Sequence, residues 1–151
     1  MNNELRELYQ QVILDHNKSP RNYKKLETAT NSSEGKNPLC GDHIHLYVKM
    51  NNDVVEDISF EGNGCAISKS SASLMTSIVK GKTKAEAEQL FEKFHDLVTG
   101  KISEDEDLTD LGKLAVFQGV REFPVRVKCA SLAWHTLHSA LKDENKIVTT
   151  E

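Results

Sequence analysis

The sequence predicts an α+β domain in which helices cover one face of a small antiparallel sheet. Two observations predict this class. Hydrophobic residues alternate with a period of two along residues 43–50 and again along residues 54–60, as is typical of strands. Helical hydrophobic spacing precedes this region once and follows it several times. The chain has 151 residues, the usual size of one domain, so we expect residues 1–151 to form a single domain.

The N-terminal segment, residues 1–16, is predicted to be an amphipathic helix. Its apolar residues recur at helical spacing and form one stripe, which comprises Leu5, Leu8, Tyr9, Val12 and Ile13. Pro20 ends this helix because proline disfavours a helical conformation in the residue before it. Residues 21–39 contain few apolar side chains, and we predict a long loop there.

The two strands are expected to pair as an antiparallel hairpin. In the first strand Ile44, Leu46 and Val48 alternate with more polar neighbours. The sequence Asn-Asn-Asp at residues 51–53 separates the strands, and these residue types favour tight turns. Two glycines in the segment 62–64 end the second strand.

Helical patterns resume after the hairpin. Residues 67–78 carry one helical stripe of apolar side chains. The next helix is predicted to begin at a capping box, in which the Thr83 hydroxyl and the Glu86 carboxylate each accept a hydrogen bond from the other residue's backbone N–H. Its apolar stripe extends to about Val98.

The C-terminal third is predicted to contain two further helical segments. We interpret the acidic residues 103–107 as a solvated helix start and residues 108–120 as a short, interrupted helical segment. Pro124 fits the first turn of the last helix, because proline is tolerated there. One side of that helix carries Cys129, Leu132, Ala133, Thr136, Leu137 and Ala140.

Composition excludes several classes of function. The net charge is −4 and the pI is about 5.9, so we expect no basic surface for nucleic acid. The chain lacks an apolar run of about 18 residues, and its polar start does not fit a signal peptide, so we expect neither a membrane span nor secretion. In a reducing cytoplasm its three cysteines are not expected to form structural disulfides.

The cysteines lie at the predicted ends of elements. Cys40 precedes the first strand, Cys65 lies where the hairpin leads into a helix, and Cys129 lies early in the last helix. Helix N-termini favour the thiolate, the form that binds metals. Three thiolates together with the Asp42 carboxylate would suit zinc or the edge of an iron–sulfur cluster. Because no two cysteines are closely spaced, spacing alone also permits buried hydrophobic cysteines or a single redox thiol.

The histidines are not expected to contribute to this site. His135 and His138 are interpreted as part of the solvent-facing side of the last helix. His16 and His95 lie near helix ends, where a positive charge is mildly stabilised. The sequence shows no serine–histidine–aspartate arrangement, phosphate-binding loop or paired catalytic carboxylates, so a classical hydrolase or oxidoreductase is not expected.

Three motifs surround the cysteines: Asn-Pro-Leu-Cys-Gly-Asp at residues 37–42, Gly-Asn-Gly-Cys-Ala-Ile-Ser at residues 62–68, and Arg-Val-Lys-Cys-Ala at residues 126–130. Together they resemble the U-type iron–sulfur cluster assembly proteins, the family of IscU, SufU and the N-terminal domain of NifU. The sequence Ser-Pro-Arg-Asn at residues 19–22 adds to a resemblance that covers nearly the whole chain.

The resemblance implies an α+β fold with a three-stranded sheet and a site at one end of it. Carried over by motif, Cys40, Cys65 and Cys129 are the thiol ligands of that site and Asp42 is its acid. The implied partners are a cysteine desulfurase and other cluster-assembly proteins.

Two departures point to one branch of the family. Lys128 stands where IscU-type members have a histidine, and the segment before Cys129 is longer than in that type. Residues 123–128 read Phe-Pro-Val-Arg-Val-Lys instead of containing the Leu-Pro-Pro-Val-Lys segment, so we do not expect docking of an Hsp70-type chaperone. These features resemble the SufU branch, which implies bound zinc and a role in sulfur transfer.

We therefore expect a cytoplasmic, zinc-bound sulfur acceptor for a SufS-type cysteine desulfurase, with Cys40 as the accepting thiol. At most it would be a sulfurtransferase-type enzyme, and by default a monomer. Arg126 is expected either to dock the desulfurase or to be a surface charge near a helix start. One alternative is a scaffold that binds iron and builds a transient [2Fe–2S] cluster, and another is a structural zinc-binding interaction domain.

Overall fold

A four-stranded sheet with the strand order β3-β2-β1-β4 forms one layer of the fold. The computed structural model describes residues 3–103, 105–143 and 147–150. The strands are β1 (Asn31–Asn37), β2 (Asp42–Asn51), β3 (Val54–Asn63) and β4 (Ile147–Thr149). Neighbouring strands among β1, β2 and β3 pair antiparallel, whereas β4 pairs parallel with β1 at the sheet edge.

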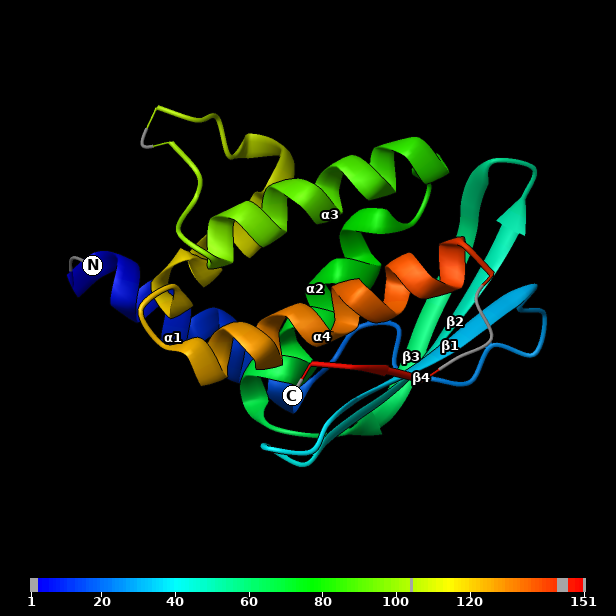
Figure 1. Cartoon of the computed structure of the whole chain (residues 1–151), viewed down its shortest axis with the longest axis horizontal. Helices are drawn as coiled ribbons and strands as arrows, with labels where there is room; N and C mark the ends of the chain where they lie inside the picture. Colours follow the sequence, from blue (N-terminus) through cyan, green and yellow to red (C-terminus); the bar gives the residue numbers. More distant parts are fainter. Residues whose placement is uncertain (1–2, 104, 144–146, 151) are drawn as a thin grey trace.

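Helices form the second layer and confirm the α+β class. The helices are α1 (Asn3–Lys18), α2 (Ala66–Val79), α3 (Lys84–Val98) and α4 (Pro124–Leu141), and η1 (Thr109–Val120) is a 3₁₀ segment. Helices α2 and α4 pack against the sheet, while α1, α3 and η1 pack against those two helices (Figure 1). Aromatic rings join the outer helices to α4, since the Phe94 ring stacks on Trp134 at 5.0 Å between centroids and meets Phe117 edge-on at 5.8 Å.

The prediction of a loop over residues 21–39 is wrong for β1, and the sheet has four strands instead of three. The inward positions of β1 are Ser33, Gly35 and Asn37, all of them buried. None of these residues is apolar apart from glycine, so β1 lacks the hydrophobic alternation by which strands are predicted. Before β1, the Lys24 N–H donates a hydrogen bond to the Phe60 carbonyl of β3, and the Phe60 N–H donates to the Asn22 carbonyl. Both distances are 3.0 Å.

Small residues on β1 allow α4 to approach the sheet closely. A Cβ atom on Gly35 would lie 2.1 Å from Thr136 Oγ1 and 3.0 Å from Leu132 Cδ1, both on α4. The Thr136 side chain is fully buried and donates a hydrogen bond to the Leu132 carbonyl at 2.7 Å, so it has little room to move. This contact sets the distance between α4 and the strand that leads to Cys40.

The predicted hairpin and capping box are both confirmed. Strands β2 and β3 pair antiparallel around residues 51–53, where Asn52 adopts a positive φ of 56°. At the start of α3, the backbone N–H of Glu86 donates to Thr83 Oγ1 at 3.1 Å, and that of Thr83 donates to Glu86 Oε1 at 2.9 Å.

The interruption predicted within residues 108–120 is also confirmed, because Gly112 breaks η1 with a φ of 55° and a ψ of −132°. The acidic stretch differs from its prediction as a helix start. The helical segment begins only at Thr109, whose N–H donates to Asp107 Oδ1 at 3.0 Å. Glu104, within that stretch, lies outside the described residues.

The N-terminal helix forms as predicted, but its stripe is only partly buried. Val12 and Ile13 are each 7% exposed, whereas Leu8 is 48% exposed, and the Leu5 side chain lies outside the described residues. His16 differs from the prediction of a charged helix end, since it is buried and its Nδ1 lies 2.7 Å from Ser73 Oγ. Burial lowers the pKa of His16 and favours its neutral form. Within the described residues, no helix has both the length and the apolar character needed to cross a membrane.

Replacing Gly35 by alanine tests the close approach of α4. The added methyl group must displace Thr136 or Leu132, so Gly35→Ala is expected to lower the free energy of unfolding by about 1–3 kcal/mol. Urea unfolding measures this change. The control is Ser32→Ala on the exposed side of β1, expected to change stability by less than about 0.5 kcal/mol. Equal effects of the two substitutions would contradict the packing described here.

Candidate metal centre

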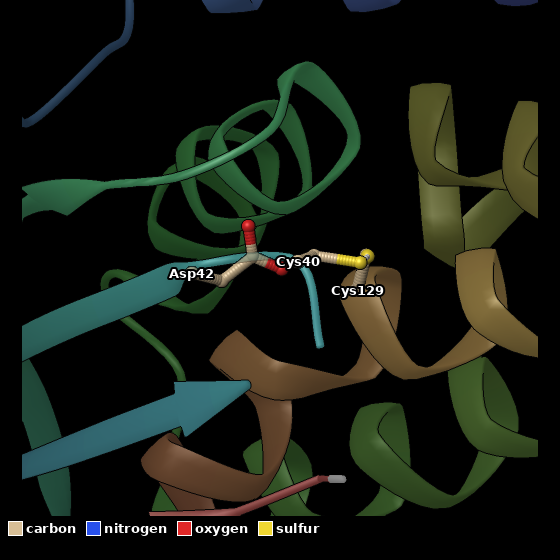
Figure 2. Close-up of side chains that lie close together, drawn as sticks. All are labelled: Cys40, Asp42 and Cys129. Atoms are coloured by element: carbon tan, nitrogen blue, oxygen red, sulfur yellow. Dashed lines mark hydrogen bonds between the residues drawn. The ribbon is translucent and has the colours of Figure 1, made fainter. Parts of the chain in front are cut away.

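Three chain segments meet at one end of the sheet and carry the cysteines. Cys40 lies in the turn between β1 and β2, Cys65 at the junction of β3 and α2, and Cys129 in the second turn of α4. Figure 2 shows the Cys40 and Cys129 sulfur atoms side by side, with the Asp42 carboxylate next to them. The segments are distant in the sequence, so tertiary packing alone brings these groups together.

The β1–β2 turn presents Cys40 at its tip. Asn37 at the end of β1 and Asp42 at the start of β2 form the strand pair next to this turn. Within the turn, the Cys40 N–H donates to the Asn37 carbonyl at 3.2 Å. Gly41 follows with a φ of 70°, a left-handed conformation that glycine adopts without strain. The turn therefore directs Cys40 and Asp42 to the same end of the sheet.

Distances between donor atoms define a compact group. The Cys129 Sγ and Cys40 Sγ atoms are 3.2 Å apart. One donor atom each from Cys40, Asp42 and Cys129 lies within 4.8 Å of the other two. Cys65 adjoins this group through Asp42, since its Sγ lies 3.9 Å from Asp42 Oδ2. The structure thus brings all four residues predicted for the site together, with Cys65 at its side.

Cys65 is held by the start of α2, of which it is the N-cap residue. Its Sγ accepts a hydrogen bond from the Ser68 N–H at 3.4 Å. Its own N–H donates to Asp42 Oδ1 at 2.8 Å and links the helix start to the β1–β2 turn. Gly64 makes room for this link, because a Cβ atom there would lie 2.6 Å from Asp42 Oδ1.

Asp42 is a buried carboxylate, only 2% exposed. Within the part of the chain that the structure describes it forms no ion pair, and its hydrogen-bonding neighbours are the backbone and thiol of Cys65. Burying an ionised carboxylate is costly unless a cation is close to it. A bound metal ion would supply that cation.

The thiols differ in their tendency to ionise. The neighbouring Cys129 thiol lowers the pKa of Cys65 to about 7, with help from the Ser68 N–H and against the effect of burial. The same contact with Cys65, together with burial and the bond to Cys40, raises the pKa of Cys129. In the metal-free protein, Cys65 is therefore the readily formed thiolate, whereas Cys129 stays protonated and donates to Cys40.

Sequence reasoning missed the contribution of Asn37 to the site. Asn37 is fully buried, and its Nδ2 donates to Cys129 Sγ at 3.6 Å. The amide thereby orients the sulfur atom of the most deeply buried cysteine. Its place within the same motif as Cys40 and Asp42 is the signal by which it could have been found.

Arg126 lies on the exposed first turn of α4, one turn before Cys129. Its guanidinium carbon lies 4.5 Å from the centroid of the Phe123 ring, as in a cation–π contact. Lys128, which precedes Cys129, is only half-buried and belongs to a different face of the helix. Neither side chain forms part of the compact donor group.

The fold is an α+β fold with three thiols and a buried carboxylate at one end of its sheet. Such a donor set is typical of proteins that bind a soft metal ion or transfer sulfur. Comparison with known proteins agrees with this class. The model of the NifU-like N terminal domain family matches residues 8–130, and the chain belongs to that family. The resemblance recognised in the three cysteine motifs is thereby confirmed.

Individual relatives match over most of their length. The zinc-dependent sulfurtransferase SufU of Bacillus subtilis (strain 168) is 45% identical over 143 residues, which cover 95% of each chain. The iron-sulfur cluster assembly scaffold protein IscU of Streptococcus pyogenes serotype M1 is 42% identical, over 92% of this chain and 86% of the relative. The crystal structure of FiSufU from Fervidobacterium islandicum AW-1 has a TM-score of 0.82 at 38% identity, over 89% of this chain and 97% of that chain.

Titration of the metal-free protein tests the assignment of the thiolate. Ultraviolet thiolate absorbance is expected to rise with a midpoint near pH 7, because the pKa of Cys65 is lowered to about 7 from its ordinary value of 9.0. Below that pH the thiol is protonated and the signal is lost. Cys65→Ser should abolish the transition, whereas Cys129→Ala should shift it upward by removing the thiol that lowers the pKa of Cys65. A midpoint near pH 7 that persists in Cys65→Ser would refute the assignment.

Proposed function

We propose that this protein binds zinc through Cys40, Asp42, Cys65 and Cys129 and accepts sulfur from a cysteine desulfurase for iron–sulfur cluster assembly. The observation that carries the proposal is the convergence of three thiols on a buried carboxylate that has no ion-pair partner among the described residues. The name of the Bacillus subtilis relative, a zinc-dependent sulfurtransferase, supports it.

The donor set fits zinc. Zinc in proteins prefers four donors that are thiolates, imidazoles or carboxylates, and this site offers three thiols and one carboxylate. When bound, zinc would hold the thiols in their thiolate form. Asp42 is a harder ligand than a fourth cysteine, so it would leave the site more exchangeable than a structural four-cysteine site.

Exposure and hydrogen bonding favour Cys40 as the accepting thiol. Cys129 is 2% exposed, which closes it to a large partner. Cys65 caps α2 and accepts a backbone hydrogen bond from Ser68, which ties its sulfur to the helix. Cys40 is half-buried on a turn, beside Leu39, which is 64% exposed. Cys65 is half-buried as well, so its tie to the helix, and not its exposure, distinguishes it from Cys40.

The transfer is a thiol exchange reaction. The Cys40 thiolate attacks the outer sulfur of the persulfide carried by the desulfurase cysteine, and a new sulfur–sulfur bond forms on Cys40. The bond between the outer sulfur and the desulfurase cysteine breaks, and that cysteine leaves as a thiolate. The persulfide proton stays with the transferred sulfur, so atoms and charge balance without an added oxidant or reductant.

Exposed side chains beside Cys40 and at the start of α4, the helix that carries Cys129, offer a surface for the desulfurase. Leu39, Phe123 and Val125 are 64%, 45% and 53% exposed, respectively. Arg126 lies beside Phe123 and would add a positive charge to that apolar surface, which favours a partner with an exposed carboxylate. We assign Arg126 to this docking role. The free state of all three cysteines fits a reducing cytoplasm as the place of the reaction.

A second candidate function is that of a scaffold for a transient [2Fe–2S] cluster. The relative from Streptococcus pyogenes named as an iron-sulfur cluster assembly scaffold supports it, and thiolates also bind iron–sulfur clusters. Stoichiometric zinc that survives dialysis supports the sulfur acceptor, whereas brown protein with iron and sulfide supports the scaffold.

Replacement of Cys40 tests its role as sulfur acceptor. Cys40→Ala should reduce desulfurase sulfide release, assayed with cysteine and a reductant, to the rate of the desulfurase alone. Without reductant, mass spectrometry of the wild-type protein should find the additional sulfur atom on the peptide that contains Cys40. Ser32→Ala, on the exposed side of β1, serves as a control that keeps every thiol and every side chain of the docking surface, and it should retain acceptance. Full stimulation by Cys40→Ala, or sulfur found on Cys65 or Cys129, would exclude Cys40 as the acceptor.

A further inference from the structure

A second polar pocket lies away from the thiols, between α3, α4 and β4. Its volume is about 290 Å³, and none of the four thiol-site residues lines it. In Figure 1 strand β4 runs alongside α4 near the C-terminus. The Thr150 hydroxyl donates to the Lys128 carbonyl at 3.2 Å and joins the end of β4 to α4. The pocket is thus formed by three elements that converge from different parts of the chain.

One face of α4 supplies much of the lining. Lys128, Ser131 and His135 are spaced by three and four residues, so they share a helix face. Cys129 is turned about 100° away from Lys128 by the helical repeat and belongs to the face that packs against the sheet. The two sites are therefore neighbours along α4 but open in different directions.

The pocket is lined by basic groups without an acidic one. Lys128, His95 and His135 line it, and no aspartate or glutamate among the described residues does. The His95 and His135 rings meet edge-on with centroids 5.9 Å apart. Burial and then the neighbouring imidazoles of His95 and His138 lower the pKa of His135 and favour its neutral form. His135 is half-buried here, so the prediction of a solvent-facing helix side is wrong for it.

A buried hydroxyl group in the lining lacks a partner. Ser131 is 6% exposed, and its Oγ has no hydrogen-bond partner among the described residues. Buried polar groups in proteins are almost always satisfied, so an unsatisfied one that lines a pocket indicates a ligand atom or a bound water. An oxygen atom that carries negative charge would satisfy Ser131 and balance the charge of Lys128.

We propose that this pocket binds a small molecule that bears a carboxylate or a phosphate. Lys128 supplies the charge, Ser131 a hydroxyl donor, and His95 and His135 imidazole N–H donors. The volume is near the lower limit for small-molecule sites, so an organic acid or a small phosphate ester fits better than a dinucleotide. This inference does not depend on the proposed sulfur transfer.

The test uses inorganic phosphate and succinate as probes, titrated into the zinc-loaded full chain at constant ionic strength. Histidine ring signals in NMR spectra report binding, and His95→Gln and His135→Gln assign them. We expect saturable shifts of the His95 and His135 signals with at least one probe. Whether the shifts occur with phosphate, with succinate or with both would identify the oxyanion that the pocket prefers.

Matched variants separate the pocket from general effects on α4. Lys128→Gln should weaken binding about tenfold and Ser131→Ala about threefold. The controls are Lys142→Gln at the end of α4 and Ser139→Ala, a second buried serine of α4 whose hydroxyl has no partner among the described residues. Both should bind within about twofold of wild type. Zinc content is measured for each variant, to show that the thiol site is intact.

Four results would overturn the proposal. The first is an absence of saturable shifts with either probe, and the second is equal shifts with chloride at the same ionic strength. The third is an equal loss of binding in the control variants. Unchanged binding in both Lys128→Gln and Ser131→Ala, with the zinc content intact, would likewise refute it.

Discussion

The close packing of α4 on β1 and β2 is the constraint on which the site depends. Gly35 lets the helix approach, and Asn37, the next inward residue of β1, reaches the Cys129 sulfur. Cys129 lies on the same buried side of α4 as Leu132 and Thr136, so its position follows from that of the core. The distance between the Cys40 and Cys129 sulfur atoms is therefore a product of helix–sheet packing and not of a local motif.

Electrostatics make the site incomplete without a cation. Asp42 is buried, and among the described residues only Cys65 bonds to it. The neighbouring Cys129 thiol favours the thiolate of Cys65, which adds a second negative charge beside that carboxylate. A metal ion would offset both charges, and because a metal that binds only the folded state stabilises it, metal binding and folding are expected to be coupled.

The fold was predictable from the sequence where local chemistry determines structure. The capping box at Thr83 and the break at Gly112 both follow from residue type. Strand β1 was not predictable, because its buried positions are occupied by Ser33, Gly35 and Asn37 and not by hydrophobic residues. Helix α4 packs close to these small and polar residues and covers the strand. Strand β4 has only three residues and carries no pattern long enough to identify it.

The metal centre, like the fold, was predictable from the sequence only in part. The helix-end positions of the cysteines indicated thiolates, but spacing alone could not bring Cys40, Cys65 and Cys129 together, because long-range packing does so. The family resemblance supplied that step. The half-buried position of His135 was missed because its partners, His95 and β4, come from other elements.

The identity of the metal and its ligands tests the central claim most directly. X-ray absorption of the purified protein, combined with metal analysis, measures both. We predict about one zinc per chain with three sulfur ligands and one oxygen, and loss of the oxygen in Asp42→Ala. Stoichiometric iron and sulfide in place of zinc, or a zinc ligand shell that Asp42→Ala leaves unchanged, would contradict a zinc site built from these four residues.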